Sequence, residues 1–149
     1  MASHSQLLYH VIWTTRDRKP VLYKSYRQKL LAFIVSQFSM HKCEVLAING
    51  VDDHLHLLLY IHHSIPVGKI IEHVKKKSAE WIKTSSQLHG FEAWQAGHSV
   101  FTCHPENKEE MIRYIKKQEW HHKKEAFEDE YVRVLKENKV TYQRETPWA

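Results

Sequence analysis

The feature that most constrains the fold is an apolar stretch over residues 51–61, which follows the turn-forming pair Asn49-Gly50. Its composition and length indicate a buried β-strand. Side chains on a strand point alternately to its two faces, so His54 and His56 share one face. Their Cα atoms are about 6.6 Å apart, twice the rise per residue, and this separation lets both imidazoles reach one metal ion. A pair of hydrogen-bonded core histidines is the other interpretation of an isolated His-x-His pattern.

Length and composition predict one globular domain over residues 1–149, with 42% hydrophobic and 26% charged residues. No apolar run approaches the roughly eighteen residues of a membrane span, and the first residues lack the apolar core of a signal peptide. We therefore expect a cytoplasmic protein without a membrane association. Cys43 and Cys103 are isolated in the sequence and are expected to be reduced thiols in the core.

The formal net charge of +5 is compatible with a polyanionic partner such as nucleic acid. Two basic clusters are candidates for contacting it. Arg16 and Arg18 belong either to a solvated turn or to a loop that contacts phosphates. The run Lys75-Lys76-Lys77 lies on a predicted helix, where it forms either a solvated face or one side of a nucleic-acid groove.

Hydrophobic periodicity predicts the remaining elements. Residues 6–15 alternate two apolar sets, as in a central strand that is covered on both faces. Helical spacing predicts one helix over residues 24–41 and a second that begins at Pro66. Residues 43–51 should form a hairpin with the histidine strand through the Asn49-Gly50 turn.

The C-terminal part begins with a predicted strand over residues 94–103. A third helix should run from a capping box formed by Asn107 and Glu110 to about residue 123, and an amphipathic segment follows it. The resulting order is β-α-β-β-α-β, which is that of an α+β ferredoxin-like split β-α-β sandwich, here with a C-terminal helical extension. The fold class alone says little about function.

A second group of polar residues lies on the predicted third helix. Tyr114 and Gln118 are four residues apart, so their side chains lie on the same helical face. Taken alone, a tyrosine beside a core stripe is usually a packing residue with a solvated hydroxyl. Its combination with His54 and His56 is more informative.

A His-hydrophobic-His strand followed by Tyr-x-x-x-Gln on a helix resembles the single-tyrosine HUH transposases of small hairpin-ended insertion sequences, the IS200-like family. The similarity covers most of the chain. The segments that resemble the family's first strand, metal strand, last strand and catalytic helix are residues 9–16, 53–58, 94–101 and 114–122.

The resemblance implies that His54, His56 and Gln118 ligate one divalent cation, Mg²⁺ or Mn²⁺. It implies that Tyr114 attacks a backbone phosphorus of single-stranded DNA with hairpin ends, forming a 5′-phosphotyrosine and releasing a 3′-hydroxyl. Attack by another 3′-hydroxyl would then rejoin strands. It also implies a homodimer with sites in trans, where Tyr114 of one chain serves the histidines of the other.

These residue types suit phosphoryl transfer, which depends mainly on in-line positioning and charge stabilisation. A tyrosine with a reference pKa of about 10 is a usable nucleophile and a reasonable leaving group on reversal. Two imidazoles and a carboxamide fit several metals, so the pattern does not select magnesium. Asp52 either supports the metal site from the histidine face or closes the hairpin.

Two other functions remain open at this point. A replication initiator or relaxase shares the His-hydrophobic-His chemistry, usually in a larger chain. A non-catalytic nucleic-acid-binding module on an RRM-like scaffold is the alternative outside the enzymes. That second interpretation gives Tyr114 and Gln118 no role.

Overall fold

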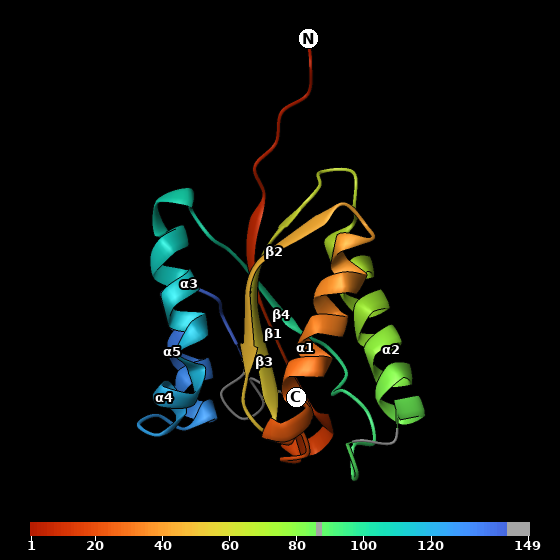
Figure 1. The fold of residues 1–149 in the computed structure, drawn as a ribbon. Coiled ribbons are helices and arrows are strands. Elements are labelled where there is room, and N and C mark those ends of the chain that lie inside the picture. The colour runs from red at the N-terminus through yellow and green to blue at the C-terminus, as the bar shows by residue number, and fades with distance from the viewer. Residues whose placement is uncertain (86–87, 143–149) are drawn as a thin grey trace.

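The computed structural model describes residues 1–85 and 88–142 and has the predicted α+β architecture (Figure 1). The strands are β1 (Leu8–Thr14), β2 (Cys43–Gly50), β3 (His54–Ile61) and β4 (Ser99–Thr102). The helices are α1 (Lys24–Ser39), α2 (Val67–Ser85), α3 (Lys108–Lys116), α4 (Gln118–His122) and α5 (Phe127–Glu137), with short 3-10 turns η1 (Arg16–Arg18) and η2 (Pro105–Asn107).

The four strands form one antiparallel sheet in the order β2-β3-β1-β4, which is the order of a ferredoxin-like sandwich. The histidine strand β3 is central, between β1 and β2. Helices α1 and α2 cover one face of the sheet, and α3, α4 and α5 lie on the other (Figure 1). The C-terminal extension therefore supplies the second helical layer.

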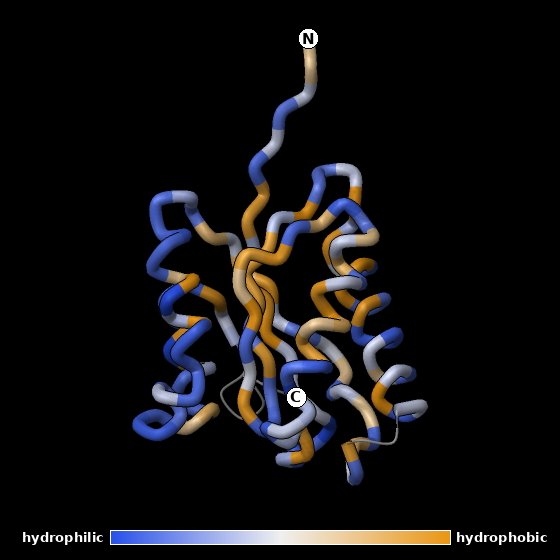
Figure 2. The backbone as a smooth tube through the Cα atoms, viewed as in Figure 1, coloured by the Kyte–Doolittle hydropathy of each residue, from blue (hydrophilic) through white to orange (hydrophobic). Residues whose placement is uncertain are grey.

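The two faces of β3 pack against different helices, with the leucines on the predicted faces. Leu55, Leu57 and Leu59 pack into the core beneath α1 and α2. On the opposite face, Leu58 packs with Ile115 of α3. Figure 2 shows the apolar strands lying between helices that are hydrophilic on their outer sides. Burying both faces stabilises the sheet by roughly 25 cal/mol per Å² of apolar surface, and it makes β3 a rigid support for the histidines.

The β2–β3 hairpin forms as predicted, but its turn lies at residues 51–53 and not at Asn49-Gly50. Asn49 pairs with His56, so both residues of the expected turn belong to β2. Gly50 is required for close packing: a Cβ there would lie 2.4 Å from Cδ2 of Leu55 and 2.7 Å from the His54 carbonyl oxygen.

The last strand is shorter than the predicted 94–103. Gly97 has a φ of +84°, a left-handed conformation that interrupts an extended chain. The carbonyl oxygens of Gln95 and Gly97 accept hydrogen bonds from the Nζ of Lys75, at 2.8 and 2.6 Å. Only residues from Ser99 onward therefore pair along β1 as a regular strand.

The predicted third helix is broken at Lys117, whose φ of −100° and ψ of 22° end α3 before α4 begins. The expected capping box is wrong, because Asn107 makes no side-chain capping hydrogen bond. Instead, Nδ1 of His104 accepts a hydrogen bond from the Glu106 amide at 3.2 Å, ahead of α3.

Cys43 and Cys103 are buried and free, as predicted. No helix within residues 1–85 and 88–142 is long and apolar enough to cross a lipid bilayer.

Candidate metal centre and nucleophile

Strand β3 and the C-terminal helices bring four potential ligands together. They are His54 and His56 of β3, His122 at the end of α4 and Glu130 of α5, and their ligand atoms all lie within 4.8 Å of one another. Nε2 of His54 is 3.0 Å from Nε2 of His122, and Nε2 of His56 is 3.1 Å from Oε1 of Glu130. Three imidazoles and a carboxylate that converge in this way are a ligand set that could hold a metal ion.

Hydrogen bonds on the far side of each imidazole orient the two β3 histidines. Nδ1 of His54 lies 2.7 Å from Oδ1 of Asp53, and Nδ1 of His56 lies 2.9 Å from Nε2 of His10. When Nδ1 carries the proton in these bonds, Nε2 has no proton and directs its lone pair toward the cluster, where it can ligate a metal ion. Burial lowers the pKa of His56 to about 4, so this imidazole is neutral at pH 7 and in its ligating form.

His54 differs from His56 in its charge balance. Burial disfavours its protonated form, but hydrogen bonds with Asp53 and Glu130 outweigh burial and raise the pKa of His54. A divalent cation would compete with this proton for the same Nε2, because metal ligation requires the neutral imidazole.

Glu130 is the acidic member of the cluster and is only 1% exposed. Its Oε1 also lies 2.9 Å from Nε2 of His122. Burial alone would raise the pKa of Glu130, but hydrogen bonds with His122, His54 and His56 reverse the shift and lower it. The side chain is therefore a buried carboxylate whose partners are imidazoles, as a buried charge requires.

The Tyr114 hydroxyl lies at the same carboxylate. It donates a hydrogen bond to Oε2 of Glu130 and accepts one from Nη2 of Arg133 at 3.0 Å. The ring centroid of Tyr114 is 5.9 Å from that of His56 in the same chain. Burial and the adjacent Glu130 carboxylate raise the pKa of Tyr114, so the free protein holds a protonated phenol there.

Gln118, the third predicted ligand, is completely buried at the start of α4. Its Nε2 lies 3.5 Å from the Tyr114 carbonyl oxygen, while its Oε1 has no hydrogen-bond partner among the described residues. A buried carbonyl oxygen without a partner costs on the order of 1–3 kcal/mol, which a metal ion or a water would recover.

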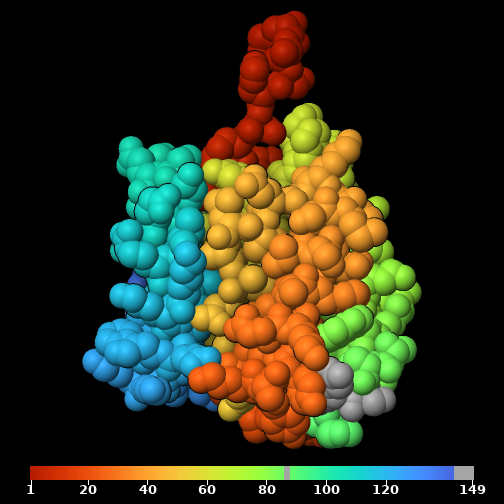
Figure 3. Space-filling model, in the orientation of Figure 1, coloured from red at the N-terminus to blue at the C-terminus, as the bar shows by residue number. Residues whose placement is uncertain are grey.

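Two contacts fasten the tyrosine-bearing segment to the rest of its own chain. Nδ2 of Asn49 donates to the carbonyl oxygen of Lys116 at 3.0 Å, at the end of α3. Nη1 of the buried Arg27 donates to Oε1 of Glu119 at 3.3 Å, at the start of α4. Figure 3 shows α3 and α4 packed beside β2 and the beginning of α1.

Asp52 closes the hairpin and does not join the cluster. Its Oδ1 accepts a hydrogen bond from Nη2 of Arg27 at 2.7 Å. The neighbouring Asp53, and not Asp52, supports the candidate metal site, because it contacts Nδ1 of His54.

The predicted DNA-contacting cations lie in three different settings. Arg16 is exposed, whereas Arg18 pairs with Glu128 and with Asp53, the latter at 3.3 Å. Lys75 is buried, and its Nζ is bound to loop carbonyl oxygens and is not exposed to a partner in this structure. Lys76 and Lys77 are exposed on α2, in the helical layer opposite the histidines.

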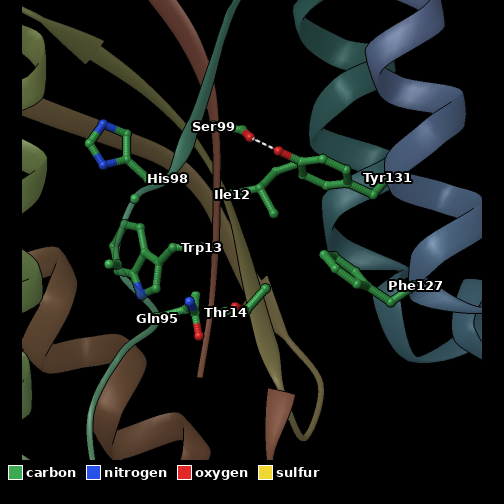
Figure 4. Close-up of a pocket in the computed structure, with 10 residues that line it drawn as sticks. Ile12, Trp13, Thr14, Gln95, His98, Ser99, Phe127 and Tyr131 are labelled. Carbon is green, nitrogen blue, oxygen red and sulfur yellow. Dashed lines mark hydrogen bonds between the residues drawn. The ribbon is translucent and has the colours of Figure 1, made fainter. Parts of the chain in front are cut away.

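A cavity of about 200 Å³ adjoins the cluster between β1, the segment before β4 and α5 (Figure 4). Phe127 lines this cavity, and its ring also lies 4.3 Å from the His54 ring, centroid to centroid. The Tyr131 hydroxyl points to Ser99, with which it forms a hydrogen bond (Figure 4). Tyr114 is therefore the tyrosine placed at the candidate metal site.

Sequence reasoning identified His54, His56 and Tyr114 but missed His122, Glu130 and Arg133. One signal for Glu130 was available. Residues Phe127, Tyr131 and Val134 form the apolar stripe of α5, and a glutamate three positions after Phe127 lies on that stripe. A carboxylate on the buried face of a helix needs a partner, so it marks a candidate site.

Comparisons with known proteins find similarity to transposases. A family model described as "Transposase IS200 like" matches residues 3–118. The ISDra2 transposase TnpA of Deinococcus radiodurans is 25% identical over 118 residues, covering 76% of this chain and 84% of that protein.

Two solved structures share the fold. A Deinococcus radiodurans R1 protein assigned as a transposase has a TM-score of 0.63 and 24% identity, covering 79% of this chain and 95% of that one. A REP-associated tyrosine transposase, solved with a REP hairpin, has a TM-score of 0.61 and 14% identity, covering 82% of this chain and 74% of that one.

Proposed function

Because the chain belongs to the IS200-like transposase family, we propose that it cleaves and rejoins single-stranded DNA at hairpin ends with Tyr114 as the nucleophile. One observation carries the choice of residue: the Tyr114 hydroxyl contacts Glu130, whose carboxylate also contacts the β3 histidines. The REP hairpin bound to a transposase of the same fold supports a hairpin substrate.

In the proposed reaction, the Tyr114 oxygen forms a bond to the phosphorus of a backbone phosphodiester. The bond from that phosphorus to the 3′-oxygen breaks, which leaves a 5′-phosphotyrosine and a 3′-oxygen that takes a proton from water. Oε2 of Glu130 already accepts the hydrogen bond of the phenol and is placed to take its proton. Attack by a second 3′-hydroxyl reverses these changes and joins two strands.

We propose that His54, His56, His122 and Glu130, whose ligand atoms converge, hold a divalent cation, and that Gln118 is a further candidate ligand. The candidacy of Gln118 is supported by its buried Oε1, which has no hydrogen-bond partner within the part of the chain that the structure describes. When bound, the cation supplies positive charge to the scissile phosphate. Mixed nitrogen and oxygen donors suit Mn²⁺ better than Mg²⁺, which favours oxygen ligands and waters.

We infer that the site is complete within one chain. The expected dimer would bring Tyr114 to the histidines of the partner, but Tyr114 here lies beside His56 of its own chain. The bonds from Asn49 and Arg27 to the tyrosine-bearing segment support this arrangement. A cis site needs no exchange of helices between chains.

The other interpretations explain less. A replication initiator or relaxase would use the same histidines and tyrosine, but the family match over residues 3–118 favours a transposase. A binding-only module leaves a buried carboxylate, three imidazoles and a tyrosine hydroxyl together without a task.

Incubation with 5′- and 3′-labelled oligonucleotides carrying a hairpin, followed by denaturing gels, tests the proposal. We expect a covalent adduct to the 5′ side of the break that requires Mn²⁺ or Mg²⁺ and is lost with EDTA. Tyr114→Phe removes only the hydroxyl and should abolish the adduct, whereas Tyr131→Phe, whose hydroxyl bonds Ser99, should retain it. An adduct that persists in Tyr114→Phe would refute Tyr114 as the nucleophile.

A further inference from the structure

Helix α5 lies beyond residue 118, where the family match ends, and brings a guanidinium to the nucleophile. Nη2 of Arg133 donates to the Tyr114 hydroxyl oxygen at 3.0 Å, and its guanidinium carbon is 5.5 Å from the Tyr114 ring centroid. Arg133 is three residues after Glu130, so the two side chains lie on one face of α5. The phenol oxygen is therefore held between an acceptor and a cationic donor.

The guanidinium is fixed by two other carboxylates. Nε and Nη2 of Arg133 bind Glu125 at 3.2 and 3.0 Å, and Nη1 binds Glu137 at 3.0 Å. With the bond to Tyr114, these interactions with described residues use four of the five N–H groups of an arginine. One N–H of Nη1 remains for a further oxygen, and the plane of the guanidinium is already set.

A cleft gives a substrate access to this position. The space between α3 and α5 has a volume of about 320 Å³ and is lined by both Tyr114 and Arg133. The side chain of Arg133 is 37% exposed, so it remains reachable from solvent. An anionic oxygen entering the cleft would meet Arg133 beside the phenol oxygen.

We propose that Arg133 is a catalytic residue, which contacts both the Tyr114 oxygen and a non-bridging oxygen of the scissile phosphate. This inference rests on the proposed function. Arg133 forms no covalent bond and keeps its protons. As the bond from the Tyr114 oxygen to phosphorus forms and the bond to the 3′-oxygen breaks, the guanidinium stabilises the charge on the phosphoryl oxygens and holds the nucleophile in line.

Chemical rescue tests this role. Single-turnover rates of adduct formation are measured at saturating single-stranded DNA and Mn²⁺ for the parent, Arg133→Ala, Arg133→Lys and Arg113→Ala. Arg113 is an exposed arginine on α3, next to Tyr114 in sequence, and serves as the matched control. Loss of one preorganised charge-stabilising donor should slow Arg133→Ala on the order of 100-fold.

Guanidinium chloride at non-denaturing concentration should restore part of the Arg133→Ala rate, while equal NaCl should not. Arg133→Lys keeps the positive charge but loses the planar set of N–H donors of the guanidinium. Its rate should therefore lie between those of the parent and the alanine variant. Arg113→Ala should react at the parental rate. Thermal unfolding of each variant shows whether the fold is intact.

A parental rate in Arg133→Ala would overturn the inference about Arg133, but it would not contradict the proposal that Tyr114 is the nucleophile. A second result would also overturn it: Arg133→Ala is slow and is not rescued by guanidinium, while Arg133→Lys reacts at the parental rate. Any positive charge at position 133 would then be enough for the parental rate, and the guanidinium group would have no specific role. A parent protein that forms no adduct would refute the proposed function itself, and the role of Arg133 would fall with it.

Discussion

Glu130 is the residue that joins the two halves of the candidate site. One of its oxygens contacts the imidazoles of His56 and His122, and the other accepts the hydrogen bond of Tyr114. A buried carboxylate is costly unless each oxygen has a partner, and here both oxygens do. Its charge would stabilise a cation among the imidazoles, and in the free protein it keeps the phenol protonated by raising the pKa of Tyr114.

We expect Glu130→Gln to lower the affinity for Mn²⁺ by at least about 10- to 100-fold, the range found when a group that only orients the ligands of a metal site is lost. Adduct formation should fall with it, because the amide is a poor proton acceptor. Isothermal titration with Mn²⁺ measures the first effect. Asp129→Asn removes an exposed carboxylate from the same helix and should leave the affinity unchanged. Equal losses in both variants would point to a general charge effect.

The sequence was informative about residues that belong to a motif. His54, His56 and Tyr114 could be found because His-x-His on a strand and Tyr-x-x-x-Gln on a helix restrict which faces they share. His122 and Glu130 belong to no such pattern, and their positions depend on the break at Lys117 and on the path of α5. Tertiary packing decides both, so local periodicity could not place them.

At the scale of elements, α2 shows how a charge run can mislead. Consecutive residues on an α-helix are about 100° apart, so three adjacent lysines cannot share one face. Lys75 follows Ile71 by one turn and therefore lies on the buried stripe, where it binds the carbonyl oxygens of Gln95 and Gly97. It fixes the loop before β4, whereas Lys76 and Lys77 remain exposed.

Lys75→Met should lower the free energy of unfolding by about 1–3 kcal/mol, because the loop carbonyls lose their donor while the aliphatic packing is kept. Chemical denaturation of the parent and the variant measures this difference. Lys76→Met, at an exposed position of the same helix, is the control and should change stability little. Similar losses for the two lysines would show that the buried contacts contribute nothing.

At the scale of the whole molecule, the sheet separates two layers with different tasks. Helices α1 and α2 bury the apolar face of β3, and the layer of α3, α4 and α5 carries the tyrosine and the carboxylate (Figure 1). The fold class and strand order could be predicted because they follow from the order of periodic segments. The assembly could not, because either cis or trans sites are compatible with the same order.

Mixing two inactive variants distinguishes these assemblies. His56→Ala and Tyr114→Phe are co-expressed with different affinity tags, and any mixed dimers are purified and assayed for adducts. A site built within one chain leaves every chain with its own defect, so we expect no recovery. Recovery of a substantial part of the parental activity in the mixed dimers would establish sites in trans.

The position of Glu130 and Arg133 on α5 also sets when the site can exist during synthesis. A ribosome adds the strands of the sheet, both β3 histidines and Tyr114 before it adds either of these residues. A chain released by a stop codon between positions 119 and 129 would carry the nucleophile without the carboxylate and the guanidinium that contact it. The proposed chemistry therefore becomes possible only once residue 133 has been added, and a nonsense mutation between positions 119 and 129 would silence it.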